Sequence, residues 1–385
     1  YLSFALLNHP AVEAAYAEWR ASVAAIEPAA ALPDPQLTFQ ADIAETLTSL
    51  MPGLMFDLTS AGKRTAQGRA AAAGAEVARR NFNLAAQTVA RQLRETWIEL
   101  AYVAAARQLH AAATISVGDT GALAAAAQAT GRPGGNLGDL IELQGDLAEH
   151  HADHAALGDR LQAARLAFKA ALGLAPADHD PPWPDFPLSV EPLPDDQTVW
   201  WRILERNPDL AALRALVDQS VAAVAVAESA ATPDFGLGAM VDFKASPLLV
   251  RPVANLSLPI WRTRLDHQVA AARAQHDAAL AQVDLNALDL AARVARALYT
   301  VHQADRMLAY IDHTARPNLD RLIATRSADY ESGAGDLAAL TTVATRRILL
   351  RLARLDLLRE RADAVTELRF LSADAAPADL SETAS

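Results

Sequence analysis

Two histidines one helical turn apart are the residues of this chain whose types and spacing best suit chemistry. The segment EHHADH places His150 and His154 four residues apart, with Asp153 between them. On a helix this spacing puts both imidazoles on one face, and imidazole is a common zinc ligand. His150 and His154 are therefore candidate metal ligands, although a solvated helix face explains the same pattern. With four methionines, the chain has no methionine relay for soft copper.

A second candidate, SAGKRT at residues 60–65, resembles half of a phosphate-binding loop. The complete motif needs a glycine five positions before Gly62 and a serine or threonine directly after Lys63. This chain has Asp57 and Arg64 at those positions. A basic collar where a strand leaves a membrane is the better interpretation of the segment.

Composition and motifs exclude several classes of function. The 34 basic and 46 acidic residues give a net charge of −12 without a basic cluster, so nucleic acid is not an expected partner. The chain has no cysteine, which excludes disulfides and thiolate metal sites and is compatible with export. No catalytic set or nucleotide motif is recognisable, so we expect a protein that is not an enzyme and has no cofactor.

One stretch of the chain repeats another. LLNHPAVEAAYAEWR at residues 6–20 is echoed by LERNPDLAALRALVD at residues 204–218. Further matches follow in the same order at an offset near 200 residues: Pro33 with Pro233, Lys63 with Arg262, and Gly131 with Gly333. One order and one offset indicate a duplicated structural unit.

Each repeat contains a segment that alternates with period two, which predicts a β-hairpin. The first hairpin covers residues 35–59 and includes a turn around TSLMPG at residues 48–53. The second covers residues 233–259. In both hairpins apolar side chains occupy one face and polar or small ones the other, as a strand with two different surroundings requires.

Helices account for the rest of each repeat. Opening helices are predicted at about residues 3–31 and 198–231, long helices at 61–130 and 262–331, and return helices at 137–172 and 337–372. The long helices carry apolar residues at spacing seven, among them Leu280, Ala287 and Val294, which is typical of a coiled coil. At 1.5 Å per residue, each would be about 105 Å long.

The lengths of these elements define the domain organisation. An opening and a return helix together match one long helix, so two short helices stacked end to end would lie alongside it. We therefore predict a first structural repeat at residues 1–174 and a second at 198–372. A proline-rich equatorial strap at 175–197 joins them, and residues 373–385 form a disordered tail.

Two hairpins leave open sheet edges, which favour aggregation unless other chains cover them. The chain has no run of about 18 apolar residues, so no transmembrane helix is predicted. Strands of nine to eleven residues can instead span a bilayer as a closed barrel, with apolar side chains toward lipid and polar ones toward a lumen. The predicted lumen residues are Asp57, Asp242, Arg251 and Asn255.

These features together resemble the TolC-like outer-membrane efflux family. The resemblance covers about residues 4–372 and rests on an order of motifs that occurs twice: the NP helix start, the PD before a strand, a hairpin and then a long helix. AGKR, LPIW and the turn YESGAGDLAAL complete it. Gly62, Lys63 and Arg64 are similar to a sequence of the heavy-metal branch, typified by CzcC-like and CusC-like proteins.

The resemblance implies a fold and an assembly. The fold class is mainly α with a membrane β-barrel portion, made of long antiparallel coiled-coil helices and four β-strands per chain. Three chains would form a homotrimer with a trimeric α-helical barrel and a 12-stranded β-barrel. The implied partners are outer-membrane lipid, a periplasmic adaptor (membrane fusion) protein and an inner-membrane efflux pump.

The resemblance also implies an acidic gate at the periplasmic entrance. Asp139 matches the acidic position of the family in the first helix tip, and Glu142 follows on the same helix. The second tip departs from the family, with Ala339 and Thr342 at the acidic positions and Asp336 as the nearest acid. Asp139 and Asp336 are equally explained as acids that complement the helix dipole near a helix N-terminus.

The function expected from these observations is an exit duct in the outer membrane of a Gram-negative bacterium, with a periplasmic helical tunnel. It would pass substrate from the adaptor and pump to the exterior. The alternative is a soluble periplasmic coiled-coil adaptor or scaffold protein, which would share the heptads and the acidic charge. The strand pattern favours the duct, because an adaptor has no use for apolar outward faces on four strands.

Overall fold

The computed structural model of the chain describes residues 1–43, 47–129, 137–184, 188–243, 247–332, 335 and 337–375. The chain divides into two compact units, each assembled from distant segments. Unit 1 contains Tyr1–Val12, Ala86–Asn207 and Ala291–Ser385, and unit 2 contains Glu13–Ala85 and Pro208–Leu290. Two long helices, α4 and α8, contribute residues to both units, and all four strands belong to unit 2.

The opening helix of each repeat is broken at a proline, where the sequence pattern predicts one continuous helix. The first repeat has α1 (Leu2–Asn8), α2 (Pro10–Ala24) and α3 (Ile26–Ala30), and the second has α6 (Asp196–Arg206) and α7 (Pro208–Ser229). The residues before the two prolines, His9 and Asn207, have ψ angles of 123°. Proline disfavours helical geometry at the residue that precedes it, so both repeats break at the same place.

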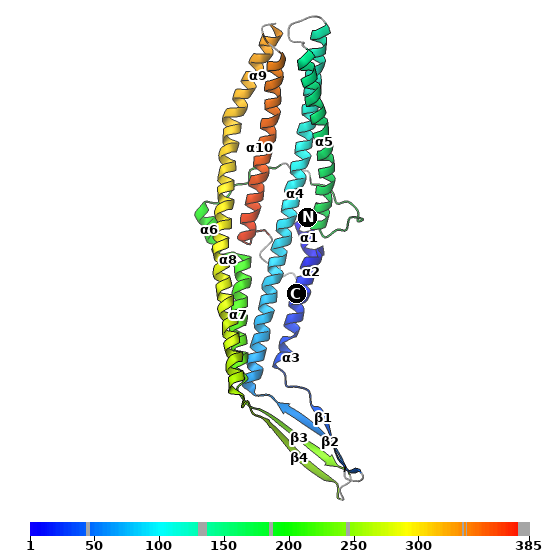
Figure 1. The fold of residues 1–385 in the computed structure, drawn as a ribbon, viewed down its shortest axis with the longest axis vertical. Helices are drawn as coiled ribbons and strands as arrows, with labels where there is room; N and C mark the ends of the chain where they lie inside the picture. Colours follow the sequence, from blue (N-terminus) through cyan, green and yellow to red (C-terminus); the bar gives the residue numbers. More distant parts are fainter. Residues whose placement is uncertain are drawn as a thin grey trace. The chain divides into compact units, whose positions relative to one another are not determined.

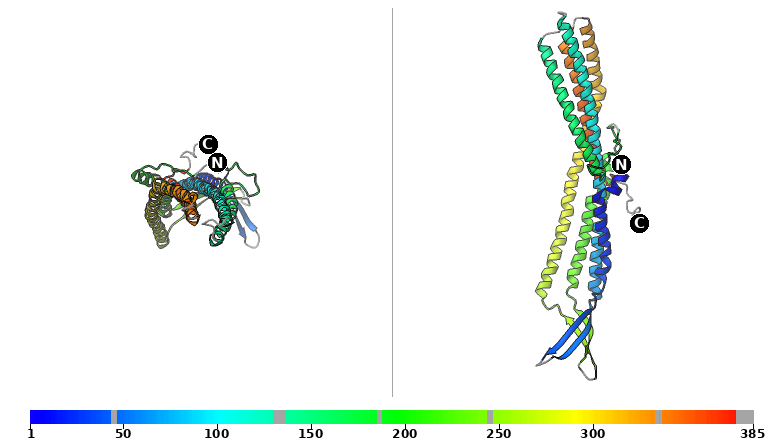
Figure 2. Two further views of the ribbon diagram at one scale, coloured as in Figure 1. Left: turned by 90° about the horizontal axis from the view of Figure 1, so that it is seen from above. Right: turned by 90° about the vertical axis from the view of Figure 1, so that its right-hand side faces the viewer.

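The long helix of the first repeat is uninterrupted. It is α4 (Ala61–Ala129), followed by the return helix α5 (Leu137–Ala171). In unit 1 these two helices lie side by side (Figure 1, Figure 2). The buried seam of α4 has heptad spacing and consists of Phe82, Ala86, Val89, Leu93, Leu100 and Val103. Burial of this stripe explains why so alanine-rich a helix has a defined inner face.

The sequence pattern predicts one continuous α-helix for the long helix of the second repeat. The structure instead divides it into three segments. It consists of α8 (Arg262–Tyr310), a π-helical turn η1 (Ile311–Ala315) and α9 (Arg316–Glu331). Pro317 lies at the start of α9. Proline has no N–H to donate to the preceding turn and its ring displaces that turn, so the helix widens there.

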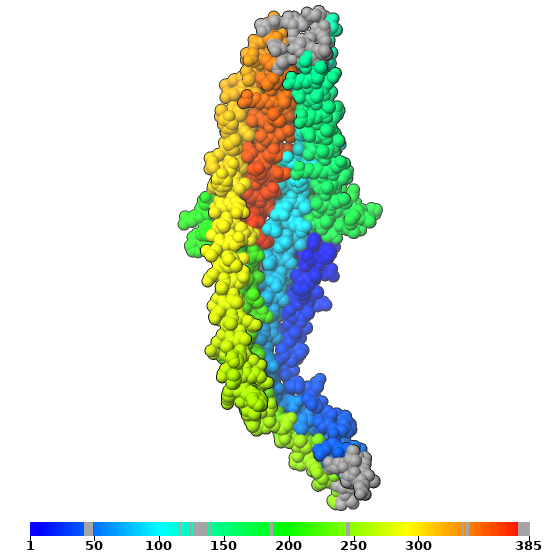
Figure 3. Space-filling view, viewed as in Figure 1, coloured from blue at the N-terminus to red at the C-terminus, as the bar shows by residue number. Residues whose placement is uncertain are grey.

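The return helix of the second repeat is α10 (Leu337–Leu371). It lies beside α9 in unit 1, as the ribbon and the space-filling view both show (Figure 1, Figure 3). In α8 the heptad seam is buried from Leu290 onward, whereas Leu280 on the same seam is 45% exposed. The apolar heptads of α8 therefore extend into a part of the helix, around Leu280, where the seam is exposed rather than buried against other residues of this chain.

The four strands form one antiparallel sheet in the order β1-β2-β3-β4. They are β1 (Gln36–Ile43), β2 (Leu47–Leu58), β3 (Asp234–Asp242) and β4 (Leu249–Ser257). Pairing of β2 with β3 joins the hairpins of the two repeats.

The predicted turn around residues 48–53 is wrong, because those residues belong to strand β2. Pro52 is compatible with a strand here because the ladder between β2 and β3 begins only at the next residue, Gly53. The missing N–H of the proline therefore leaves that ladder intact.

The proline-rich strap is anchored at both ends within unit 1. At its start the buried Lys169 donates from Nζ to the carbonyl oxygens of Pro176, at 3.1 Å, and Asp178, at 2.6 Å. At its end Asp195 caps α6 by accepting a hydrogen bond from Thr198 N at 3.0 Å. Residues 179–184 and 188–194 have no regular secondary structure between these anchors.

The predicted disordered tail begins with three residues that are placed against α4. Gln87 donates from Nε2 to the carbonyl oxygen of Ala373 at 3.0 Å and accepts from the N–H of Ala375 at 3.1 Å. The remaining part of the predicted tail, residues 376–385, lies outside the described residues.

One helical stretch of the described residues is long and apolar enough to cross a membrane by length and composition, where the sequence pattern predicts none. This is Asp196–Ser229, with a mean hydropathy of 1.6 over 18 residues and 11% of that window buried. Alanine and valine raise its hydropathy, while Asn207 and Pro208 divide it into α6 and α7. Length and composition alone are weak evidence for a membrane span.

Gly173 ends α5 in a conformation that a side chain would disrupt. Its φ is +82°, and a Cβ there would lie 2.9 Å from both Asn8 O and His9 Cα. A Cβ at Gly158, within the same helix, would meet nothing within 4 Å.

We therefore expect Gly173→Ala to cost about 1 to 3 kcal/mol of stability through the left-handed backbone. Gly158→Ala should be neutral or stabilising by up to about 1 kcal/mol, because alanine favours helix. Thermal unfolding followed by circular dichroism compares the two variants. Equal melting temperatures would contradict the tight contact at Gly173.

Candidate functional site

One face of the sheet in unit 2 is apolar and exposed. Rows of apolar side chains run across the strands, since Phe56 pairs with Leu237 and Leu58 with Phe235. The large apolar strand residues of this face that are at least 37% exposed are Leu37, Phe39, Leu50, Leu54, Phe56, Leu58, Phe235, Leu237, Val250 and Leu256. So large a contiguous apolar surface needs an apolar environment outside the chain.

The opposite face of the sheet carries the four predicted lumen residues. Asp57 accepts a hydrogen bond from Gln36 Nε2 at 2.8 Å. Asp242 is buried, and Arg251 Nη2 lies 3.4 Å from its Oδ2. Asn255 is opposite Gly236, which in turn pairs with Asp57. The structure thus places Asp57, Asp242, Arg251 and Asn255 on one face, opposite to the apolar one.

Glycines make room for the polar side chains on this face. A Cβ at Gly236 would collide with the amide of Asn255, and a Cβ at Gly238 would collide with the backbone carbonyl of Leu54. The Gly-x-Gly spacing in β3 therefore keeps both positions of the polar face free of side chains. This lets the side chain of Asn255 lie over Gly236 and lets the backbone of β2 approach Gly238 closely.

Lys63 links the start of α4 to the start of β3. Its Nζ lies 2.6 Å from Asp234 Oδ2, and its side chain is only 14% exposed. The hydroxyl of Ser60 accepts from the N–H of Lys63 at 3.3 Å and lies 3.2 Å from Thr232 Oγ1. In the predicted basic collar, Lys63 therefore forms an ion pair that connects the start of α4 to the start of β3.

Two of the predicted gate acids, Asp139 and Glu142, lie near the start of α5. Asp139 belongs to the first turn of α5, and Glu142 is exposed on the next turn. Asp336 lies outside the described residues, just before α10 begins at Leu337. The position of Asp139 suits either a gate residue or an acid that complements the helix dipole.

The structure groups His150 with partners that the sequence does not pair with it. His150 and Asp153 on α5 lie close to His110 on α4, with one ligand atom from each within 4.8 Å of the others. His154 is not a member of this group. Sequence reasoning missed His110 because it lies 40 positions away on another helix; the available signal was an isolated polar residue on the inner stripe of α4.

A network of ion pairs, also missed from the sequence, joins the helices of unit 1. Glu367 on α10 pairs with Arg293 on α8 at 2.7 Å and with Arg91 on α4 at 3.3 Å. Glu191 of the strap pairs with Arg94 on α4 and, at 2.6 Å, with Arg369 on α10. Each carboxylate thus connects two arginines from different helices, which fixes their relative positions.

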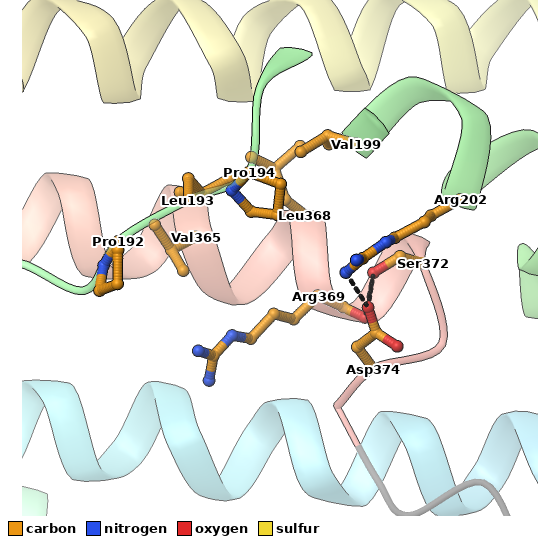
Figure 4. A pocket seen from close by; sticks show the side chains of 10 residues that line it. All are labelled: Pro192, Leu193, Pro194, Val199, Arg202, Val365, Leu368, Arg369, Ser372 and Asp374. Atoms are coloured by element: carbon orange, nitrogen blue, oxygen red, sulfur yellow. Dashed lines mark hydrogen bonds and ion pairs between the residues drawn. The ribbon is translucent and has the colours of Figure 1, made fainter. Parts of the chain in front are cut away.

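The end of the strap lies over a cavity of about 310 Å³ in unit 1 (Figure 4). Pro192, Leu193 and Pro194 of the strap line it together with Val365 and Leu368 of α10. At one end Asp374 accepts a hydrogen bond from Ser372 Oγ at 3.0 Å and lies 3.9 Å from Arg202 Nη1. Among the described residues, no catalytic arrangement of side chains lines this cavity. It is best explained as the place where the end of the strap packs against α10.

Two carboxyl groups in unit 1 have raised pKa values. Burial raises the pKa of Asp363 to about 6, against the opposing effect of Arg359. Burial also raises the pKa of Glu95, again against a neighbouring arginine, Arg91. The two acids lie on α10 and α4 and repel each other electrostatically. Desolvation therefore outweighs the arginines at both positions.

Comparison with known proteins finds one family model that matches part of the chain and several solved structures that share its fold. Residues 201–373 match the family model described as outer membrane efflux protein. No curated protein matches the chain. The chain is similar to crystal structures of CusC, with 18% identity, a TM-score of 0.81, and coverage of 96% of this chain and 90% of that chain.

Two further solved channels have the same fold. The outer-membrane channel OprN has 16% identity and a TM-score of 0.84, covering 97% of this chain and 89% of that chain. The open state of the Neisseria gonorrhoeae MtrE outer membrane channel has 18% identity and a TM-score of 0.80, covering 97% and 88%.

The chain therefore has the fold of TolC-like outer-membrane efflux channels over nearly its whole length. Its resemblance to the outer-membrane efflux family in sequence is carried by residues 201–373, most of the second repeat. This is a family of channels rather than of enzymes, which agrees with the polar and apolar faces of the sheet.

Asp363 makes the stability of the protein dependent on pH. Because its pKa is raised from 3.8 to about 6, the folded protein holds this proton more tightly than the unfolded chain. The resulting stabilisation is complete below pH 3.8 and is lost as pH rises through about 6.

Asp363→Asn, which cannot ionise, should therefore raise the melting temperature at about pH 8 and lose this advantage toward about pH 4. With a discount for partial exposure, the gain is on the order of 1 kcal/mol. The exposed Asp159→Asn is the control, measured by circular dichroism across the same range. A gain at Asp363 that does not change with pH would disprove the assignment.

Proposed function

We propose that this chain is the outer-membrane exit duct of a tripartite efflux system and that it acts as a homotrimer. The observation that carries the proposal is the sheet, whose exposed face is apolar and whose opposite face carries Asp57, Asp242, Arg251 and Asn255. A bilayer outside and a water-filled lumen inside require this pattern.

Strand length and edges support a barrel made from several chains. β3 and β4 have 9 residues each and β2 has 12, close to the length that spans a bilayer when tilted. In the described sheet β1 and β4 pair on one side only. Three copies that join β4 to the β1 of the next chain give a closed 12-stranded barrel, which leaves no backbone group unpaired in lipid.

Exposed apolar residues on α8 support the same assembly. Leu280, Leu285 and Leu288 of unit 2 are 45%, 59% and 72% exposed. These leucines precede the part of α8 whose heptad seam is buried, which begins at Leu290. In a helical barrel an adjacent protomer would cover them. A soluble adaptor or scaffold, the alternative function, does not explain an apolar sheet face in addition to these residues.

The remaining parts of the proposal follow from the resemblance to efflux channels. The barrel would lie in the outer membrane of a Gram-negative bacterium, and the helices would form a periplasmic tunnel. The tunnel would receive substrate from a periplasmic adaptor protein and an inner-membrane efflux pump. The duct needs no cofactor or catalytic residue, because the pump supplies the energy.

The assembly is tested with one charge placed on either face of the sheet. Leu237→Arg puts a cation on the apolar face near the middle of β3, at a cost of roughly 2 to 4 kcal/mol in the bilayer. Asn255→Arg places the same charge on the polar face. We expect Leu237→Arg to reduce the amount of trimer extracted from outer membranes, and Asn255→Arg to assemble normally.

Wild-type trimer reconstituted in planar bilayers should also conduct ions. Light scattering of the detergent-solubilised protein gives the oligomeric state, and single-channel recording gives the conductance. A monomer that is stable without detergent, or equal tolerance of both arginines, would refute the duct.

We further propose that Asp139, Glu142 and Asp336 form an acidic gate at the periplasmic entrance. Three chains would bring copies of these carboxylates close together, and they would attract cations more strongly than on an open surface. Asp139→Asn should lower cation selectivity and weaken block by multivalent cations in planar bilayers, and Asp336→Asn should do so more weakly. Unchanged selectivity in the double variant would assign these acids to helix termini instead.

A further inference from the structure

Three side chains that commonly bind metals converge where α4 lies beside α5 in unit 1. His110 belongs to α4, and His150 and Asp153 belong to α5. One ligand atom from each lies within 4.8 Å of the other two. We propose that they form a binding site for a divalent transition metal of the zinc class. This site is separate from the proposed duct function and does not depend on it.

His110 lies on the stripe of α4 that is otherwise occupied by buried apolar residues. Its neighbours on the same stripe, at helical spacing, are Ala106 and Ala113, and both are buried. The side chain of His110 is itself only 12% exposed. A polar ring in an apolar seam costs free energy unless its nitrogen atoms have partners.

Both imidazoles have a nitrogen that is buried and unsatisfied. Among the described residues, neither His110 Nδ1 nor His150 Nδ1 has a hydrogen-bond partner. Asp153 Oδ2 lies 3.7 Å from His110 Nδ1, which is too far for a hydrogen bond. The two rings lie 5.8 Å apart with an interplanar angle of 66°, so they are not stacked face to face.

These distances suit a shared metal ion better than direct contact. Zinc binds imidazole nitrogen and carboxylate oxygen at about 2.0 to 2.2 Å, which places tetrahedral ligand atoms about 3.3 to 3.5 Å apart. The 3.7 Å between His110 and Asp153 therefore needs only a small side-chain adjustment. A metal ion would also give a partner to imidazole nitrogens that have none among the described residues.

The ligand set and its surroundings define the class of metal. Two neutral imidazoles and one carboxylate suit Zn²⁺, Co²⁺, Ni²⁺ and Cu²⁺, whereas a site for Ca²⁺ or Mg²⁺ would be built from oxygen atoms. The side chain of Asp153 is 50% exposed, which leaves solvent access on one side of the group. Water can complete the coordination from that side.

The site would link two helices. His110 lies on α4 and the other two ligands lie on α5, so a bound ion would clamp α4 to α5 within unit 1. The pair suggested by the sequence alone, His150 with His154, lies on one helix and would not join anything. His154 is therefore a matched control on the same helix.

The test is isothermal titration of Zn²⁺ into the protein purified in detergent and treated with EDTA, whatever its oligomeric state. Wild type should bind one ion per chain, and its melting temperature should rise with Zn²⁺. His110→Gln and Asp153→Asn should each weaken binding by more than about tenfold, while His154→Gln leaves it unchanged. Circular dichroism and light scattering of each variant verify folding and assembly.

Cobalt provides a readout that does not depend on heat of binding. Visible absorption of bound Co²⁺ should appear in wild type and His154→Gln and be absent in His110→Gln. Zinc binding that is lost in His154→Gln but kept in His110→Gln would overturn the proposal in favour of the single-helix pair. Absence of binding, or equal binding in all variants, would overturn it as well. Neither result would test the proposed duct, which is judged by oligomeric state and conductance.

Discussion

For the proposed duct, the governing requirement is that backbone hydrogen bonds be satisfied in a medium without water. A four-stranded sheet with two open edges cannot lie in a bilayer alone, because each unpaired N–H or C=O group in hydrocarbon costs several kcal/mol. In the proposed trimer, closure with other copies would remove the edges, and the alternation of apolar and polar side chains would then decide which surface faces lipid. The glycines of β3 shape the polar face of this sheet, and the ion pair between Lys63 and Asp234 joins the sheet to α4.

Duplication explains why two hairpins and two helical arms are available to one chain. Each repeat uses a proline to break its opening helix, at Pro10 and at Pro208, because a residue before proline avoids helical geometry. The boundaries of the two units fall close to these breaks, after Val12 and Asn207. The same local rule, applied twice, thus divides both repeats at equivalent positions.

Much of the fold follows from local rules that the sequence displays openly. The start of α4, its heptad seam and the strand alternation depend on residues close together in the chain, so they could be predicted. The π-helical turn before Pro317 was missed because the strong heptads around it outweighed one proline. His110 could not be assigned to the metal-binding group, because the relation between α4 and α5 is set by packing in three dimensions. The ion-pair network escaped for the same reason, since its partners lie on different helices.

Ion pairs provide the register that apolar heptads leave undefined. A heptad seam packs almost equally well after a slip of seven residues, so apolar periodicity alone does not align α10 with α8 and η1. Arg354 pairs with Asp312 at 2.9 Å and Arg361 pairs with Asp305 at 2.6 Å. Both pairs keep one antiparallel register, one heptad apart. If Arg354 slipped to Asp305, Arg361 would face Leu298 and its buried guanidinium would lose its partner, which is costly in a protein interior. Charge thus selects one register among those that hydrophobic packing permits.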